Sequence, residues 1–267
     1  MTYFDNDFDN LFNELNKSFF NDDNGNTRYY FSSNSANPQT VQQIEKPKQK
    51  ENKIGRDLVK EAKDKKFDPV IGRDDQINAV IEILSRRKKN NPVLIGPAGV
   101  GKTSIVEGLA QRIASGDVPD KLRKMHIYEL NINDIVAGSS LRGSFEEKIK
   151  KVIDLAQKDP NTILFIDELH NIVGAGSTDS ENNSGDAANI LKPALASGDL
   201  KLIGATTTSE YRQIEKDPAL ARRFQAVDVP EPSGEVTVKI LQGLKKKYEE
   251  FHHVKYSDDS LKLAVEL

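Results

Sequence analysis

Beyond about residue 54, short apolar runs alternate with longer segments in which apolar residues recur every three or four positions. The short runs have the length and composition of buried strands, and the longer segments have the period of helices with one buried face. Strands are expected at residues 92–95, 126–130, 163–166 and 201–205. Helices are expected from Thr103, from Ser144, over 186–196, from Pro218, over about 233–251 and from Ser257. This alternation predicts an α/β fold whose mostly parallel sheet is covered on both faces.

The first 31 residues follow a different pattern. They hold six of the eleven phenylalanines, among many Asn and Asp residues. Two interpretations are open: a disordered tail with scattered aromatic residues, or a short helix whose apolar face contacts other proteins. Residues 32–53, rich in Ser, Asn, Gln, Lys and Pro, predict a flexible linker. The apolar face of the short helix would comprise Phe4, Phe8, Leu11, Leu15 and Phe19.

The composition favours a folded protein without a membrane or secretion signal. Of 267 residues, 37% are hydrophobic and 30% charged, which suits one large α/β domain with appendages or two modest domains. A net charge of −3 gives no reason to expect nucleic acid or an anionic membrane as partner, and the lack of cysteine excludes disulfides and thiolate metal sites. Because the apolar runs are short and the acidic N-terminus has no apolar region of its own, a cytoplasmic location is expected.

One glycine-rich segment matches the phosphate-binding pattern G-x-x-x-x-G-K-[ST] between an expected strand and an expected helix. Glycines let backbone N–H groups turn toward a phosphate where a Cβ would clash, and the start of the helix adds its positive end. Lys102 is expected to reach the β- and γ-phosphates of ATP, and the Thr103 hydroxyl to bind Mg²⁺. The residues expected to bind nucleotide here are Gly96, Pro97, Ala98, Gly99, Val100, Gly101, Lys102, Thr103 and Ser104.

A second acidic motif follows the apolar strand expected at 163–166, where Asp167 and Glu168 end the run. The carboxyl ends of parallel strands line the ligand crevice, so both acids should lie near the phosphates. Asp167 is expected to hold Mg²⁺ through water, and Glu168 to orient and deprotonate the attacking water. The chain has no N/T-K-x-D motif, which argues against guanine recognition. A small-molecule kinase stays open, although the acid pair favours water as acceptor.

Taken together, these motifs resemble the first ATPase module of the Clp-type AAA+ ATPases, a family of unfoldases and disaggregases. The resemblance covers about residues 54–267, and the short aromatic-rich start is most similar to the ClpL-type members. It implies the large subdomain of a P-loop AAA+ fold over 54–230 and the start of a helical lid over 231–267. The segments that carry it are FDPVIGRDDQI, RRKKNNPVLIGPAGVGKT, AGSSLRGSFEEKIK, ILFIDELHNIVGAG, ANILKPALASGDLKLIGATTTSEYR and EKDPALARRFQAV.

The resemblance also assigns roles beyond the two acids and the glycine-rich loop. It makes Thr206 the sensor of the γ-phosphate, where the alternative is a residue that merely ends a strand. It makes Arg222 and Arg223 arginine fingers that reach into the site of the next subunit of a ring. It places Val70 and Ile71 against adenine, although any apolar core could use both residues.

Two further expectations concern polypeptide contacts. The segment 137–143 matches a pore loop that grips substrate protein, with Leu141 where the family usually has an aromatic residue. Residues 174–186 match a second pore-facing loop or a plain surface loop. Phe4, Phe8 and Phe12 are expected to contribute to client binding or to contacts between rings.

The sequence ends inside an expected helix, which indicates a fragment or a truncated reading frame. The rest of the family's lid and its second ATPase module lie outside it, so docking to a Clp protease is not expected.

The implied function is that of an ATP-hydrolysing module of a chaperone that forms a homo-oligomeric ring and acts on misfolded or aggregated proteins in the stress response. The alternative is a non-catalytic nucleotide-binding protein that co-assembles with full-length partners.

Overall fold

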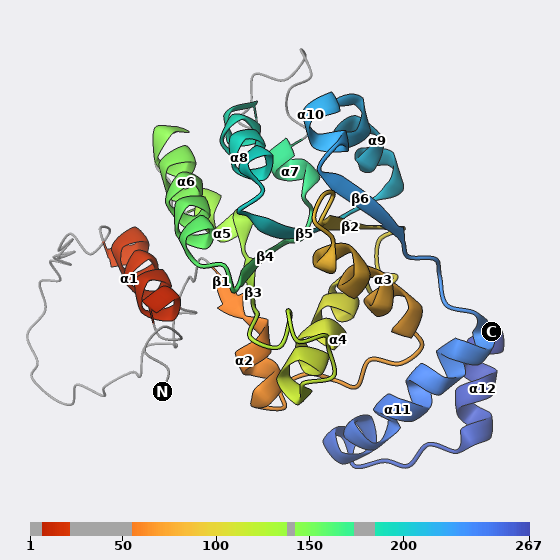
Figure 1. The fold of residues 1–267 in the computed structure, drawn as a ribbon. Helices are drawn as coiled ribbons and strands as arrows, with labels where there is room; N and C mark the ends of the chain where they lie inside the picture. Colours follow the sequence, from red (N-terminus) through yellow and green to blue (C-terminus); the bar gives the residue numbers. More distant parts are fainter. Residues whose placement is uncertain (1–6, 22–54, 138–141, 174–184) are drawn as a thin grey trace, which may run out of the picture.

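The computed structural model describes residues 7–21, 55–137, 142–173 and 185–267, arranged around one six-stranded sheet (Figure 1). The strand order is β1-β3-β4-β5-β2-β6. All neighbours run parallel except β1, which pairs antiparallel with β3 at one edge. The sheet therefore confirms the mostly parallel α/β prediction. The strands are β1 Gly55–Asp57, β2 Asn91–Ile95, β3 His126–Leu130, β4 Thr162–Ile166, β5 Lys201–Thr206 and β6 Phe224–Asp228.

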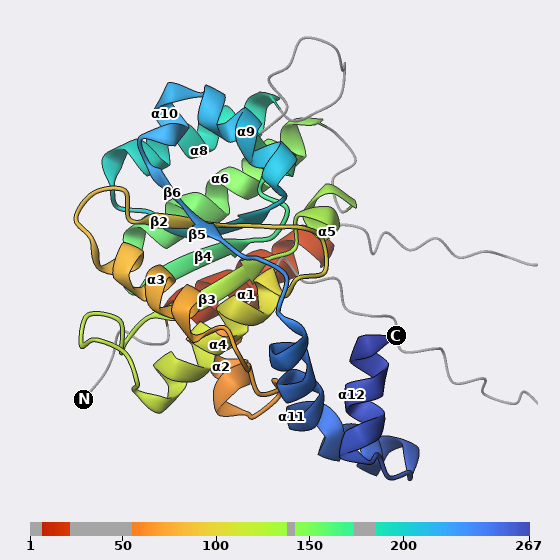
Figure 2. The ribbon, with the colours of Figure 1, turned by 90° about the vertical axis from the view of Figure 1, so that its right-hand side faces the viewer.

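Helices cover both faces of the sheet (Figures 1 and 2). On one side lie α6 (Arg142–Lys158) and α8 (Gly185–Ser197), and on the other lie α2 (Leu58–Lys63), α3 (Asp74–Ser85) and α4 (Lys102–Ser115). The remaining helices are α1 (Asp7–Asn21), α5 (Ile132–Ala137), α7 (His170–Val173), α9 (Thr208–Lys216), α10 (Pro218–Ala221), α11 (Gly234–His252) and α12 (Asp258–Glu266).

The central strands read as continuous apolar runs because both of their faces are buried. In β4, Leu164 and Ile166 join the apolar cluster beneath α6 and α8, whereas Ile163 and Phe165 join the cluster beneath α2, α3 and α4. Successive side chains of a strand point to opposite faces, so one short run supplies both layers. This two-sided burial is what holds the strand ends, and the polar residues that follow them, in fixed positions.

Both edge strands were missed from the sequence. The three residues of β1 contain no large apolar side chain, and Gly55 lies so close to the Glu129 carbonyl that a Cβ would collide with it. In β6, only Phe224 and Val227 are buried, and Gln225 and Asp228 break the apolar run. Edge strands of this kind form through pairing with a neighbour, and not through a pattern of their own.

The N-terminal helix α1 packs on the domain and does not form a disordered tail over 7–21. Phe8 and Phe12 are 6% and 4% exposed, and their ring centroids lie 4.4 Å and 5.3 Å from that of Tyr128 on β3. The expected helix is thus present, but these two rings face inward and are not displayed for contacts with other proteins, which corrects that expectation for both. Phe4 lies outside the described residues.

The last two helices, α11 and α12, form a pair that projects away from the sheet (Figure 2). A linker of five residues joins β6 to α11, whose N-cap is Ser233. The pair rests on the segment before α3, where a Cβ on Gly72 would lie 2.5 Å from Val236. Gly72 has φ +70°, so a side chain there would be strained as well as blocked.

Candidate nucleotide-binding site

The glycine-rich loop joins the end of β2 to the start of α4, as its pattern predicts. Gly99 and Gly101 adopt φ values of +80° and +92°, which other residues adopt only with strain. Gly101 is also the N-cap of α4, a helix of 14 residues, so the loop delivers the positive end of that helix to the site. Val100, which is 9% exposed, packs into the apolar cluster beneath α2, α3 and α4 and so anchors the loop.

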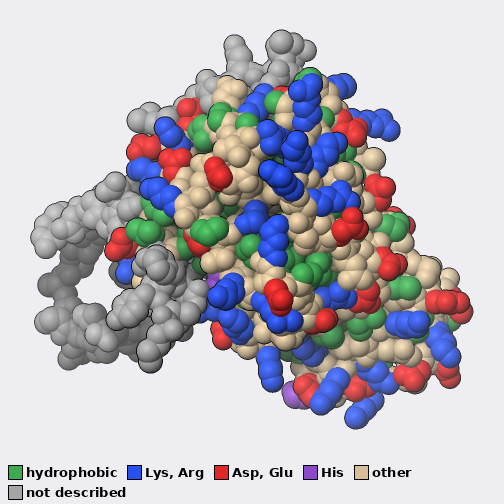
Figure 3. All heavy atoms as spheres, viewed as in Figure 1, with side chains coloured by type: hydrophobic (Ala, Val, Ile, Leu, Met, Phe, Trp, Pro, Cys, Tyr) green, Lys and Arg blue, Asp and Glu red, His purple; other side chains and the backbone are tan. Residues whose placement is uncertain are grey.

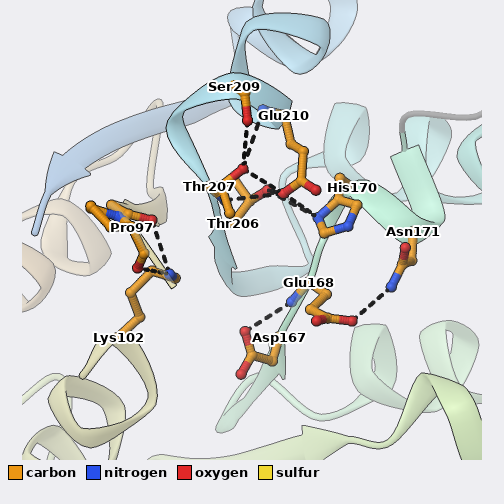
Figure 4. Close-up of polar contacts among 11 residues, drawn as sticks. Pro97, Lys102, Asp167, Glu168, His170, Asn171, Thr206, Thr207, Ser209 and Glu210 are labelled. Carbon is orange, nitrogen blue, oxygen red and sulfur yellow. Dashed lines mark hydrogen bonds and ion pairs between the residues drawn. The ribbon is translucent and has the colours of Figure 1, made fainter. Parts of the chain in front are cut away.

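Lys102 folds back over this loop. Its Nζ donates hydrogen bonds to the carbonyl oxygens of Gly96 at 3.0 Å and Pro97 at 2.8 Å (Figure 4). The ammonium group is thus held at the mouth of the loop by two neutral acceptors. An anion in the loop would compete well for a cation with such partners, since hydrogen bonds between charged groups are the stronger ones.

Thr103 and Asp167 meet across the site. The Thr103 hydroxyl donates to Asp167 Oδ2 at 3.0 Å, although 64 positions separate the two residues. The parallel sheet explains the meeting, because β2 and β4 both end at this edge. A hydroxyl and a carboxylate are oxygen ligands of the kind that Mg²⁺ prefers, so the residues present fit that ion.

Glu168 follows Asp167 with a left-handed backbone, φ +51°. Its N–H donates to Asp167 Oδ1 at 2.9 Å, and its own Oε2 accepts from Asn171 Nδ2 at 3.0 Å (Figure 4). The next residue, Leu169, donates its N–H to Ala205 O at 2.9 Å and so returns the chain to β5. A non-glycine residue with positive φ is strained, and such strain often marks a functional turn.

Thr206 ends β5, the strand between those that carry the loop and the acids. It is 2% exposed, and its Oγ1 lies 3.1 Å from His170 Nδ1 and 3.2 Å from Glu210 Oε2. Glu210 also accepts from the Thr207 hydroxyl at 2.7 Å, and the two residues form a capping box at the start of α9. Burial alone would raise the pKa of Glu210, but hydrogen bonds from Thr207, the nearby His170 and a bond from Thr206 hold it below its usual range.

These groups surround a cavity of about 380 Å³. Glycine N–H groups, one ammonium, hydroxyls and carboxylates thus face a single space, which can hold an anion together with a cation. The cavity is lined by Ala98, Gly99, Gly101, Lys102, Thr103, Ser104, Asp167, Glu168, His170, Thr206, Thr207 and Glu210.

The other expected site residues lie elsewhere. Val70 packs beside Gly108 of α4, and Ile71, the next residue, packs beside Gly243 of α11. Arg222 is exposed and Arg223 half-buried at the end of α10, and neither lines the cavity around Lys102. Leu141 and residues 174–184 of the second expected pore loop, which was predicted over 174–186, lie outside the described residues.

Four residues of the site were missed from the sequence: His170, Asn171, Thr207 and Glu210. Glu210 had a readable signal, because Thr207 and Glu210 have the T-x-x-E spacing of a capping box. His170 and Asn171 lie two and three residues after Glu168. This spacing does not indicate that His170 contacts Thr206 or that Asn171 contacts Glu168.

The outer surface adds little to the assignment. Basic and acidic side chains both occur across the face drawn in Figure 3. In the described ranges, no helix is long and apolar enough to cross a bilayer.

Comparison with known families agrees with this geometry. Residues 92–229 match the model of the ATPase family associated with various cellular activities (AAA), and residues 233–267 match an AAA lid domain. The chain therefore belongs to the AAA ATPase family. Nucleotide binding follows from that membership, and the glycine-rich loop, the acid pair and Thr206 all lie inside the first match.

Individual relatives are chaperones and protease-associated ATPases. The chain is 53% identical to the Lactococcus lactis subunit ClpE, with 83% of this chain and 29% of ClpE aligned. It is 57% identical to Meiothermus ruber chaperone protein ClpB over 80% of this chain and 25% of ClpB. The Staphylococcus aureus subunit ClpL is 43% identical, with 99% of this chain and 42% of ClpL aligned. The chain thus spans well under half the length of these three curated relatives.

Solved structures give the same result. A structure of Saccharomyces cerevisiae Hsp104 with ADP matches 79% of this chain with a TM-score of 0.72 and 47% identity, over 36% of the Hsp104 chain. Hsp104 in complex with casein matches 80% of this chain with a TM-score of 0.71 and 45% identity. At this identity the likeness extends to the fold and to its sequence motifs.

Proposed function

We propose that the chain is the ATP-binding and ATP-hydrolysing module of a Clp-type protein-remodelling chaperone. One observation carries the proposal: the glycine-rich loop and the Thr103–Asp167 pair face the same cavity, with Thr206 on the strand between them. A triphosphate needs N–H donors, a cation and a metal site within a few ångströms of one another, and these residues supply all three.

In this proposal, the loop residues 96–104 hold the phosphates through their N–H groups and Lys102. Thr103 and Asp167 hold Mg²⁺, which when bound neutralises charge on the phosphate oxygens. Val70 and Ile71 contact the adenine. The contact of Val70 with α4 and of Ile71 with α11 supports this role, because a base beside these two residues would lie near both the domain and the terminal helix pair.

For hydrolysis, Glu168 orients water and accepts its proton, and Thr206 positions that water against the terminal phosphate. Arg222 and Arg223 stabilise the transition state in the site of a neighbouring copy. Their place outside the cavity of their own chain supports action across a boundary. ATP hydrolysis is then fast in a ring and slow in a monomer.

The proposal that the chain acts in protein remodelling rests on the relatives ClpB, ClpE and ClpL and on Hsp104. One matched Hsp104 structure is a complex with the protein casein. We infer that misfolded or aggregated proteins are the clients in the cytoplasm and that Leu141 contacts them. Leucine is apolar but lacks a flat ring, so its grip should be weaker than that of an aromatic residue.

A non-catalytic nucleotide-binding role is the second candidate. It is favoured by the hydrogen bond between Glu168 and Asn171, because the amide competes with water for that carboxylate oxygen.

Phosphate release from the purified 267-residue chain separates the two candidates. The proposal expects Mg²⁺-dependent release whose rate per chain rises with protein concentration. This rate should fall by a factor of about 10² or more in Glu168→Gln. Glu82→Gln, the same change at an exposed acid of α3 outside the cavity of Lys102, is the matched control. Equal turnover by the chain and Glu168→Gln contradicts catalysis, and retained ATP affinity would then support the non-catalytic candidate.

A further inference from the structure

Arg73 lies almost fully buried between the phosphate-binding loop and the linker that precedes α11. It is 6% exposed. Its Nη2 donates to Val100 O at 2.7 Å, and its Nη1 donates to Pro230 O at 2.9 Å. Burial lowers the pKa of the guanidinium. Both of these partners are neutral backbone oxygens, whereas buried cations are usually paired with acids. Because burying an arginine without an acidic partner is costly, packing alone does not account for Arg73 at this position.

The bond to Val100 fixes one peptide unit of the loop. The carbonyl of Val100 and the N–H of Gly101 belong to the same planar group, and no cis peptide bond occurs in the described parts of the chain. In a trans peptide the C=O and the N–H point in opposite directions. Holding the Val100 oxygen toward Arg73 therefore turns the Gly101 N–H away from Arg73. Gly101 itself lines the cavity of the loop.

The bond to Pro230 fixes the linker that leaves the sheet. The preceding residue, Val229, donates its N–H to Ile95 O at 2.7 Å. Its carbonyl lies so close to Gly96, the first residue of the loop, that a Cβ there would collide with it. The start of the linker and the start of the loop thus run in direct contact, and Arg73 joins them a second time further along.

The residues beside Arg73 reach the terminal helix pair. Ile71 packs where Gly243 of α11 has no side chain, and Gly72 packs against Val236 of the same helix. Three consecutive residues therefore touch α11, the linker and the phosphate loop. A rotation of α11 would therefore be transmitted through these residues to the Val100–Gly101 peptide.

We propose that Arg73 is a positioning residue that aims the Gly101 N–H at the phosphates of the nucleotide and couples that peptide to the linker before α11. The inference rests on the proposed nucleotide binding by the loop and goes beyond it, because it names the group that connects the loop to the helix pair. Arg73 itself does not line the cavity of the loop. Its effect passes through a loop peptide and through the carbonyl of Pro230.

Two Arg73 variants and one control test this in the full 267-residue chain. Arg73→Gln removes the charge and the fork of donors, and Arg73→Lys keeps the charge but can serve the two carbonyls less well. Arg86→Gln is the control at the other end of α3, where Arg86 bonds Glu82 on the surface at 2.7 Å. The measurements are affinities for ATP, ADP and adenosine, the last by displacement of a fluorescent ADP, and hydrogen exchange of residues 229–236.

The expected result separates phosphate contacts from general folding. Arg73→Gln should lower ATP and ADP affinity at least tenfold and leave adenosine affinity within twofold, with Arg73→Lys between and Arg86→Gln unchanged. Saturating ADP should slow exchange over 229–236 in the unaltered chain and in Arg86→Gln, but not in Arg73→Gln.

Unchanged ADP affinity and unchanged protection in Arg73→Gln would overturn the inference. So would a loss of adenosine affinity as large as the loss for ADP, because that outcome means that the site has collapsed. Failure of the proposed function looks different, since the unaltered chain would then show no preference for ADP over adenosine.

Discussion

The Thr103 hydroxyl donates a hydrogen bond to Asp167 Oδ2 at 3.0 Å and so joins the two halves of the site. Thr103 lies in the first turn of α4, at the end of the phosphate loop that follows β2. Asp167 directly follows β4, which lies two places from β2 in the sheet. The contact brings a hydroxyl and a carboxylate to one point at the mouth of the loop, which is where we propose that a divalent cation bound to phosphate lies.

A pair of Thr103 variants tests this arrangement. Thr103→Val removes the hydroxyl at nearly constant volume, and Thr103→Ser retains it. Loss of one oxygen ligand should cost about 1.5–3 kcal/mol, or roughly a ten- to hundredfold loss of ATP affinity, and only when Mg²⁺ is present. Titration of ATP with Mg²⁺ and with EDTA measures the difference. Equal affinity of the valine and serine variants would contradict a metal role for Thr103.

Lys102 gives a second test of the loop. Lys102→Ala should lower the affinity for ATP and ADP by roughly tenfold or more, because the ammonium no longer meets the phosphates. Lys246→Ala, on the exposed side of α11, removes the same charge far from the loop and should bind as the unaltered chain does. Fluorescent ADP titration reports both. A Lys102→Ala chain with normal affinity would refute the phosphate-binding role of the loop.

Glu210 should make stability depend on pH. Its pKa is lowered in the folded protein, so it stabilises the fold fully above the unfolded-state value of about 4.3, and this contribution is lost as the pH falls through the lower folded value. Glu210→Ala should cost about 1 kcal/mol at pH 7 through the lost capping box, whereas Glu210→Gln keeps the cap. Urea unfolding at pH 7 and at a pH well below the carboxylate pKa measures both.

The Glu210→Gln variant is the sharper of the two changes. Since a glutamine side chain does not ionise, the gap in unfolding free energy between this variant and the unaltered chain should shrink as the pH falls from neutral to well below the carboxylate pKa. A gap that stays constant over this range would show that the carboxylate charge contributes nothing to the fold.

The packing of α1 predicts a measurable docking energy. Phe12→Ala should weaken the contact by about 1.5–3 kcal/mol, the value of burying one phenylalanine, and speed hydrogen exchange along α1. Asn13→Ala, an exposed change on the same helix, should not. A double-mutant cycle with Tyr128→Ala should give a coupling of about 0.5–1.5 kcal/mol. Exchange at the rate of an unfolded peptide before any substitution would refute the docking.

Much of the site was predictable because its chemistry lies in contiguous motifs. The glycine-rich loop and the acid pair each occupy a few adjacent residues, and the parallel sheet then brings the two motifs together without further information. Strands β2, β4 and β5 were predictable for a related reason, since burial on both faces leaves a continuous apolar run.

What escaped prediction depends on contacts between distant segments. The three residues of β1 extend only because β3 offers a free edge, and nothing in their composition indicates a strand. Arg73 looks like any surface arginine before α3, yet its two partners lie 27 and 157 positions away. Contacts to backbone carbonyls leave no trace in a pattern of side-chain types, so sequence alone could not find them.

The position of β5 in the sheet fixes the core of the site, whereas the terminal helix pair lies outside the sheet. Thr206, the acids and the start of the loop all project from neighbouring central strands, and their spacing can change only if the sheet itself deforms. The helix pair α11–α12 is joined by a short linker and rests on glycines. Selection could therefore retune how tightly such a protein binds and releases nucleotide by altering the linker before α11, while the spacing of the groups on the central strands stays the same.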